Sequence, residues 1–235
     1  MALSVPWRLI MRENAPVIER TRTSGRSVEI NKVLRNTYLL LSATFLFSAA
    51  MATVSTLLYM PPMTYLICIG LSFAIIWFVL PKTANSANGI FVVFAITGLM
   101  GFGIGPLLNQ YLAMSNGSQI VGTALGGTGL IFFALSGYAL TTKKDFSFMG
   151  GFLLVGLLVA IAASLANIFL QISGLSLAIS SAIIMIMSGF ILYDTSQMIH
   201  KPESSNYILM TVSLFLNIFN IFISLLHILG FSSDD

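Results

Sequence analysis

Residues 148–170 read FMGGFLLVGLLVAIAASLANIFL, a stretch without a single charged side chain. A helix that crosses the hydrocarbon core of a bilayer needs about 20 such residues. Apolar side chains occupy nearly every side of this helix, so it lacks the polar face that a helix of a water-soluble protein carries. Residues 148–170 are therefore predicted to span a membrane.

The rest of the chain has the same character. Charged residues make up 8% of the 235 residues, against about 25% in a typical soluble domain. No charged residue lies between Arg35 and Lys82 or between Lys82 and Lys143, and Asp194 is the only one in the next long block. The composition predicts an all-α polytopic integral membrane protein.

Clusters of turn-forming or charged residues divide the chain into seven apolar segments. Residues 32–235 are predicted to form one domain. Within it, Gly105-Pro106 is predicted to end the third span. The seven predicted spans are residues 37–59, 63–80, 89–107, 119–140, 148–170, 175–198 and 207–229.

The basic residues predict the orientation of these spans. Seven of the eleven precede residue 36, and the others are Lys82, Lys143, Lys144 and Lys201. With seven spans all eleven fall on one side, and short cytoplasmic loops are the ones that retain positive charge. We expect a membrane protein with its N-terminus in the cytoplasm and its C-terminus on the opposite side of the membrane.

Residues 1–31 combine charges with Pro, Ser and Thr and show no sustained apolar period, which predicts a flexible cytoplasmic tail. Its basic residues either set the topology and contact anionic membrane lipid or bind a protein partner. Because they flank the first span, they do not indicate nucleic-acid binding. The arginines of this tail are Arg8, Arg12, Arg20, Arg22 and Arg26.

Asp194 is the only acidic residue within a predicted span, and charge inside a membrane is costly. Two interpretations stay open. Asp194 lies close to the cytoplasmic end of its span, where Lys201 or His200 could pair with it. Alternatively, it forms a gate or a proton-sensing site inside the protein.

The last span carries Asn217, Asn220, Ser224 and His227 at offsets of 0, 3, 7 and 10, which places them on one helix face. We expect this face to point into the helix bundle. Hydrogen bonding between helices accounts for it without any chemistry. The other interpretation assigns Asn217 and Asn220, with Asp194, to a gate or pH-sensing site.

An enzymatic function is not predicted. Ser136 and His227 could form an intramembrane serine nucleophile and its base, but Ala134-Leu135-Ser136-Gly137 lacks the leading glycine of a rhomboid-type motif. The two histidines, His200 and His227, are too few for a three-histidine zinc site. We predict no catalytic residue, no metal site and no cofactor.

Small residues recur at the spacing that allows close helix packing. Gly101 and Gly105 form one such pair, and Gly122 and Gly126 form another. Both pairs are predicted to lie at interfaces between helices.

Several strings together resemble the Bax inhibitor-1 family, also called the transmembrane Bax inhibitor motif family, and within it a bacterial inner-membrane branch. The resemblance covers residues 32–233. The strings are KVLRNTYLLLS at 32–42, KTAN at 82–85, ALGGT at 124–128, LTTKKDFSFMGG at 140–151, NIFLQ at 167–171 and TVSLF at 211–215.

This resemblance implies a fold with six helices around a central seventh. It also implies a non-enzymatic role as a substrate and modulator of an FtsH-type, membrane-anchored, ATP-dependent protease. The protease engages a flexible cytoplasmic end, which maps onto residues 1–31.

Other members of the family resemble pH-sensitive calcium leak channels gated by two aspartates, which implies Ca²⁺ or H⁺ as ligands. The first aspartate maps onto Asp194 and the second onto Asn217. An Asp–Asn pair has one titrating group instead of two and offers less charge to Ca²⁺. A cation leak with this modified pair is the alternative function.

Overall fold

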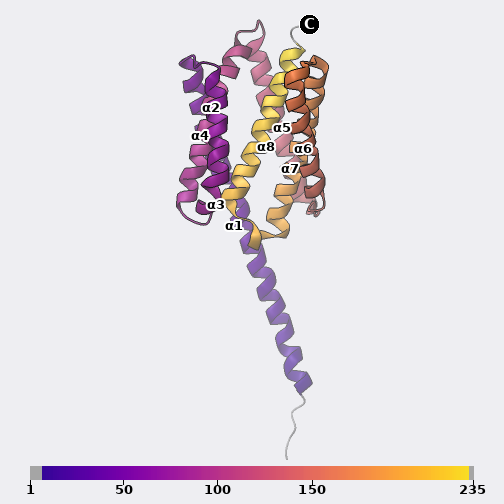
Figure 1. Cartoon of the computed structure of the whole chain (residues 1–235). Helices are drawn as coiled ribbons and strands as arrows, with labels where there is room; N and C mark the ends of the chain where they lie inside the picture. The colour runs from indigo at the N-terminus through magenta and orange to yellow at the C-terminus, as the bar shows by residue number, and fades with distance from the viewer. Residues whose placement is uncertain (1–6, 233–235) are drawn as a thin grey trace, which may run out of the picture.

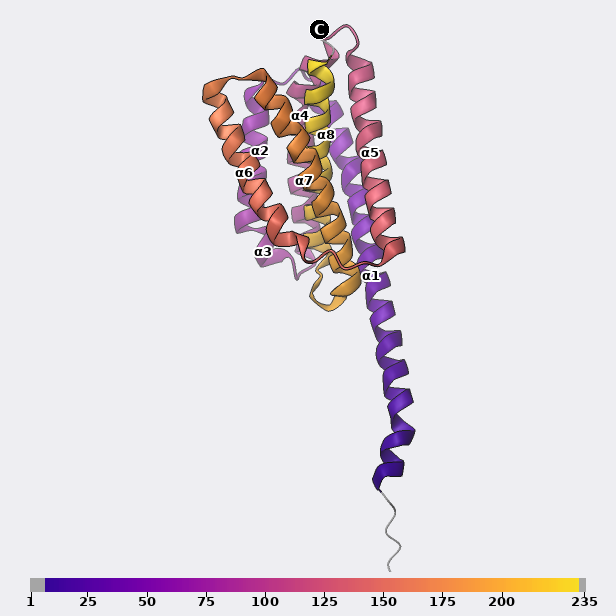
Figure 2. The same cartoon turned by 90° about the vertical axis from the view of Figure 1, so that its right-hand side faces the viewer.

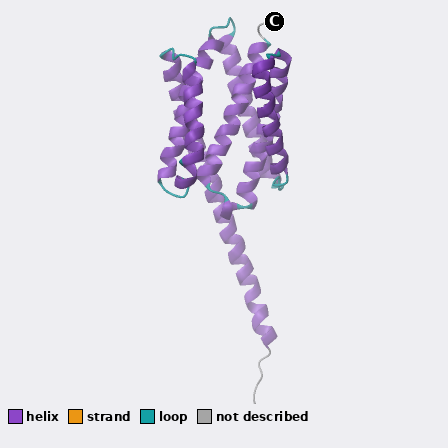
Figure 3. Ribbon diagram, viewed as in Figure 1, coloured by secondary structure: helices purple, strands orange, loops and turns teal. Residues whose placement is uncertain are grey.

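The computed structural model describes the backbone of residues 7–232 and the side chains of residues 27–232. Over this part of the chain the regular structure is entirely helical (Figure 3). The elements are α1 (Trp7–Leu57), α2 (Met63–Phe78), α3 (Leu80–Thr83), α4 (Asn88–Leu112), α5 (Gly117–Thr142), α6 (Met149–Leu170), α7 (Ser173–His200), the 3-10 helix η1 (Pro202–Ser204) and α8 (Tyr207–Phe231).

Within the described residues, six helices are long and apolar enough to cross a membrane, and α2 is a shorter apolar helix. This confirms the prediction of an all-α polytopic membrane protein. Each predicted span overlaps a helix, because runs of apolar residues between polar turns leave few alternative boundaries, but the second predicted span, residues 63–80, falls on the short α2 and the start of α3.

The main difference in the spans concerns α4. Gly105-Pro106 was predicted to end this span, but α4 continues through Pro106 to Leu112. Proline removes one helix hydrogen bond, a loss that neighbouring groups offset in membrane helices. The extra turn is held by Asn109, whose Nδ2 donates to the backbone oxygen of Thr56 on α1 at 3.1 Å.

The described part of the predicted tail is residues 7–31. They are helical and continue into the first span without a break. Extending an existing helix costs far less than nucleating a new one, so the helix of the first span can continue into the polar residues that precede it. This part of α1 projects from the end of the bundle opposite the C-terminus (Figures 1 and 2).

Helices lie on two opposite sides of α8. Helices α2 and α4 lie on one side of α8, and α6 and α7 lie on the other (Figure 1). Helix α8 packs against α1, α4, α5 and α7, and between Met210 and Gly230 none of its residues is exposed. The largest fully buried side chain is Phe215 of α8, whose ring lies 5.1 Å from that of Phe45 on α1.

The first glycine pair packs as predicted and the second does not. A Cβ atom on Gly101 or Gly105 would collide with Ser48 or Ser55 of α1, so α4 and α1 approach closely only because both positions lack a side chain. By contrast, a Cβ on Gly122 or Gly126 of α5 would meet no atom within 4 Å. The prediction of an interface within the chain at the α5 pair is wrong.

Candidate functional site

Asp194 and Asn217 are in direct contact. Both side chains are buried, with 5% and 6% of their surface exposed, and Asn217 Nδ2 donates to Asp194 Oδ2 at 2.9 Å. Ser213 Oγ donates to the same oxygen at 2.7 Å. The site therefore joins α7 to α8 through one carboxyl group and two neutral donors.

The spacing of the residues explains this convergence. Ser213 and Asn217 are four residues apart, so they lie one above the other on the face of α8 that packs on α7. Ser213 is not among the residues predicted for this site, although its i,i+4 relation to Asn217 was a usable signal. On α7, the neighbouring Thr195 is fully buried, and its Oγ1 lies 3.4 Å from the hydroxyl of Tyr38 on α1.

The two interpretations of Asp194 differ in its partners. The structure gives it hydrogen bonds from α8 inside the bundle. His200 instead contacts the α5–α6 loop, with Nε2 at 3.0 Å from the backbone oxygen of Lys143. The hydrogen bonds of Asp194 thus come from α8, and its role as a gate or proton-sensing site stays a prediction.

Asn220 lies outside the Asp194 cluster. Its Nδ2 donates to the backbone oxygen of Leu216 in its own helix at 2.8 Å, and its side chain lines a cavity of about 510 Å³. His227 and Ser224, further along α8, line the same cavity. The polar face of α8 points into the bundle as expected, but its residues divide between the Asp194 cluster and this cavity.

The serine beside His227 is Ser180. The Oγ of Ser180 lies 2.9 Å from His227 Nδ1, a pairing that the sequence analysis missed because the two residues are on different helices. Ser136 Oγ is buried without a hydrogen-bond partner. Ser136 lies near the end of α5 where the α5–α6 loop starts, whereas His227 lies near the opposite end of the bundle.

At the bundle end that carries the short basic loops, His200 joins the α5–α6 loop to α7. His200 Nδ1 lies 3.0 Å from the backbone oxygen of Ser196, while Ser196 Oγ accepts a hydrogen bond from the backbone N–H of Phe146 at 2.9 Å. Hydrogen bonding by Ser147 lowers the pKa of the Asp145 carboxyl below its ordinary value, with smaller contributions from the charges of His200 and Lys201.

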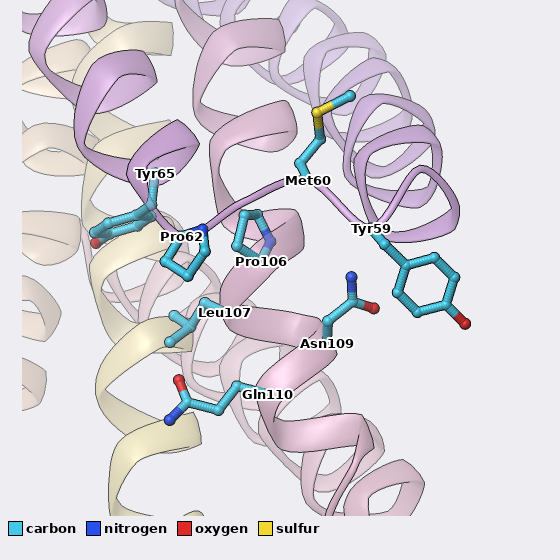
Figure 4. A pocket seen from close by; sticks show the side chains of 8 residues that line it. All are labelled: Tyr59, Met60, Pro62, Tyr65, Pro106, Leu107, Asn109 and Gln110. Atoms are coloured by element: carbon cyan, nitrogen blue, oxygen red, sulfur yellow. The ribbon is translucent and has the colours of Figure 1, made fainter.

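A second cavity, of about 620 Å³, lies at the other end of the bundle (Figure 4). The joint between α1 and α2 lines one part of it, and the last turns of α4 line another. Its polar side chains include Asn109 and the exposed Gln110. This cavity adjoins the 510 Å³ cavity, because Tyr65 and Leu107 line both.

The predicted protease-engaged residues lie outside the side chains that the structure describes. Arg8, Arg12, Arg20, Arg22 and Arg26 belong to the projecting part of α1. Among the described residues, no group of three or more His, Cys, Asp or Glu side chains is placed to hold a metal ion.

Comparison with known proteins identifies the family. Residues 30–234 match the family model described as inhibitor of apoptosis-promoting Bax1. The chain is 51% identical over 206 residues to the modulator of FtsH protease YccA of Escherichia coli K12, covering 87% of this chain and 92% of YccA. It is also 46% identical to an uncharacterized membrane protein of Vibrio cholerae, over 94% of this chain and 99% of that protein. The chain therefore belongs to the Bax inhibitor-1 family.

Proposed function

We propose that this chain is a non-enzymatic, multi-pass protein of the bacterial inner membrane that binds and modulates an FtsH-type protease and is also its substrate. The observation that carries the proposal is the 51% identity to a modulator of FtsH protease over 87% of the chain. The chain is equally identical, at 51% over 206 residues, to the inner membrane protein YccA of Escherichia coli O6:H1, which supports the location.

The segment that the protease engages is residues 1–31, with the arginines at positions 8, 12, 20, 22 and 26. The part of α1 before Ser27 amounts to about 30 Å of helix at 1.5 Å per residue. It projects away from the bundle (Figure 2), so a large protease could reach it without meeting the rest of the chain.

Co-purification from native membranes in mild detergent tests this function. The full chain should recover the FtsH-type protease, and a variant lacking residues 2–31 should lose both the protease and its own turnover. A control variant that replaces residues 2–26 by an uncharged Gly/Ser segment of equal length separates the effect of length from that of sequence. Unchanged association and unchanged turnover after the deletion would falsify the role of this segment.

We also infer that α8 is the central helix, surrounded by the six others, and that the N-terminus is cytoplasmic and the C-terminus periplasmic. The enclosure of α8 by α1, α4, α5 and α7 supports the central position. The one-sided basic residues support the orientation. A cysteine near each terminus of an otherwise cysteine-free variant, labelled in intact cells and in inverted vesicles, distinguishes the two faces.

A cation leak is the second candidate function, with Ca²⁺ or H⁺ as the ion. The hydrogen bond between Asp194 and Asn217 favours it, because these residues map onto the aspartate pair implied by the family resemblance. Purified protein in liposomes should then pass the ion in a pH-dependent manner, and Asp194→Asn should abolish the flux. Ser181→Ala, at an exposed position of α7, is the matched control. Absence of flux at every pH would reject this function.

A further inference from the structure

A groove that contains several polar side chains lies between the two sides of the bundle, at the end away from the basic loops. It is the 510 Å³ cavity described above, a volume within the range of roughly 300–1,000 Å³ that small-molecule sites usually have. Helices α2 and α4 form one wall, α6 and α7 form the other, and α8 forms the base. Ile168 stands at its α6 edge with 64% of its surface exposed, so the groove borders the lipid.

The lining of the groove changes with depth. Asn167, Ser176, Ser180 and His227 all lie within about 10 Å of the ends of their helices, counted at 1.5 Å per residue. Deeper in the groove lie Ile183 and Ile223, together with Asn220, whose amide donates to its own helix. Most of the polar side chains of the groove therefore lie near the depth of lipid headgroups and ester groups, whereas Asn220 lies deeper, beside Ile183 and Ile223.

The polar groups near the surface have more donors than their mutual contacts use. Asn167 Nδ2 donates to Ser176 Oγ at 2.6 Å, and Asn167 Oδ1 accepts from the backbone N–H of Ile172 at 3.1 Å. These two hydrogen bonds use neither the second amide hydrogen of Asn167 nor the hydroxyl hydrogen of Ser176.

The other pair leaves a donor in the same way. Ser180 and His227 share one hydrogen between Oγ and Nδ1. If the hydroxyl donates, the ring N–H lies at Nε2; if the ring donates from Nδ1, the hydroxyl hydrogen points elsewhere. Both arrangements add a donor to the groove. At this depth, water or the acceptor oxygens of a bound molecule can satisfy these donors.

We propose that this groove binds the phosphate and glycerol-ester region of one glycerophospholipid from the leaflet opposite the basic loops. Phosphate and ester oxygens are acceptors, which complements the donors of Asn167, Ser176 and the Ser180–His227 pair. An acyl chain follows the deeper lining past Ile183 and Ile223 toward the bilayer. The site is separate from the Asp194 cluster and is independent of the role toward the protease.

Native mass spectrometry of the full chain, after extraction and progressive removal of lipid, measures the occupancy. The wild type should keep one phospholipid under conditions that strip the rest. The double variant Ser176→Ala/Ser180→Ala removes two hydroxyl groups, each worth about 0.5–1.5 kcal/mol. We expect it to retain lipid about tenfold more weakly. Ser181→Ala, outside the groove on the exposed side of α7, should retain it like the wild type.

Asn167→Leu is a stronger variant, but it also removes the acceptor for the backbone of Ile172, so its thermal unfolding is measured alongside. Photoreactive phospholipid in nanodiscs gives an independent result: labelling should concentrate on residues 164–183 and 220–227. Equal lipid retention by the wild type and the double variant would overturn the proposal. So would rapid labelling of Ile183→Cys, in a Cys68→Ala background, by a charged thiol reagent in lipid-replete nanodiscs, because that result means the groove holds water only.

Discussion

Asn217 holds the position beside Asp194 at which a second carboxyl group would lie, with its Nδ2 2.9 Å from Asp194 Oδ2. An amide donates a hydrogen bond there without adding charge. The hydrogen bond between Asn217 and Asp194 can therefore form whether Asp194 is ionised or protonated. Two carboxylates at this distance could not both ionise without strong repulsion. This relationship makes Asn217 the position at which a single substitution changes the chemistry of the site.

Asn217→Asp should make the stability of the protein depend on pH. The two carboxyl groups must share a proton, so the variant should be close to wild-type stability at pH 5 and lose thermal stability as the pH rises toward 8. Thermal unfolding in detergent across this range measures the effect. Asn217→Leu is the control, because it removes the amide without adding a carboxyl group. An equal loss for the aspartate variant at every pH would contradict the prediction.

Ser213→Ala removes the other hydrogen bond to Asp194, of 2.7 Å. We expect a loss of about 1–2 kcal/mol in the free energy of unfolding, since the carboxyl oxygen loses one of its two donors. Ser181→Ala removes a hydroxyl that bonds only to its own helix, at the backbone oxygen of Leu177, and should be nearly neutral. Comparable losses for both variants would mean that the contact with Asp194 contributes nothing.

The two glycine pairs should respond in opposite ways to alanine. Gly101→Ala places a methyl group against the backbone of Ser48 and should destabilise the protein by roughly 1–3 kcal/mol, because α1 and α4 must separate. Gly126→Ala meets no atom within 4 Å and should be neutral, or more stable by about 0.5–1 kcal/mol from helix propensity. Chemical or thermal unfolding of both variants checks the difference. Destabilisation by Gly126→Ala would indicate that a partner packs on that face of α5.

His200→Ala should loosen the α5–α6 loop from the end of α7. The variant loses the contact between Nε2 and the backbone oxygen of Lys143, so that carbonyl must find water instead. Hydrogen exchange of residues 143–148 should rise several-fold, while exchange in the middle of α8 stays unchanged. His227→Ala, at the opposite end of the bundle, is the matched control and should leave this loop as in the wild type.

Asp145 should contribute to stability only where it is ionised. Its pKa is lowered from the ordinary value of 3.8, mainly by hydrogen bonding from Ser147. A lowered value means that the contribution is present above that ordinary value and disappears as the pH falls through the folded-state value. Asp145→Asn should therefore unfold at a lower temperature than the wild type at pH 6, and this difference should shrink below about pH 4. A constant difference from pH 6 to pH 3 would show that the charge is not responsible.

The backbone of this fold could be predicted from the sequence because its main signal is local. A run of about 20 apolar residues has to form a helix in a bilayer, and polar turns bound each run. The signal failed at Pro106, where local propensity predicts an end but contacts with α1 carry α4 on to Leu112. The composition of residues 7–31 also gave no signal for the helical backbone that the structure has there.

The candidate site could be predicted only in part, because helical periodicity gives a face but not its partner. Asn217, Asn220 and His227 share one face of α8 by spacing alone, yet the first contacts Asp194, the second its own helix and the third Ser180. Nothing in the sequence distinguished these three outcomes. Nor did it separate the packed glycines of α4 from the unpacked glycines of α5.

The sequence by itself therefore determined the membrane class, the helices and the isolation of Asp194 as the one acidic residue within a span. Only the tertiary structure decided that Asn217 and Ser213 are its partners and that Ser180, instead of Ser136, meets His227. The physical reason is the range of the interactions involved. Helix formation depends on neighbouring residues and on the bilayer, whereas a contact between two helices depends on how residues far apart in the chain are rotated and shifted against each other.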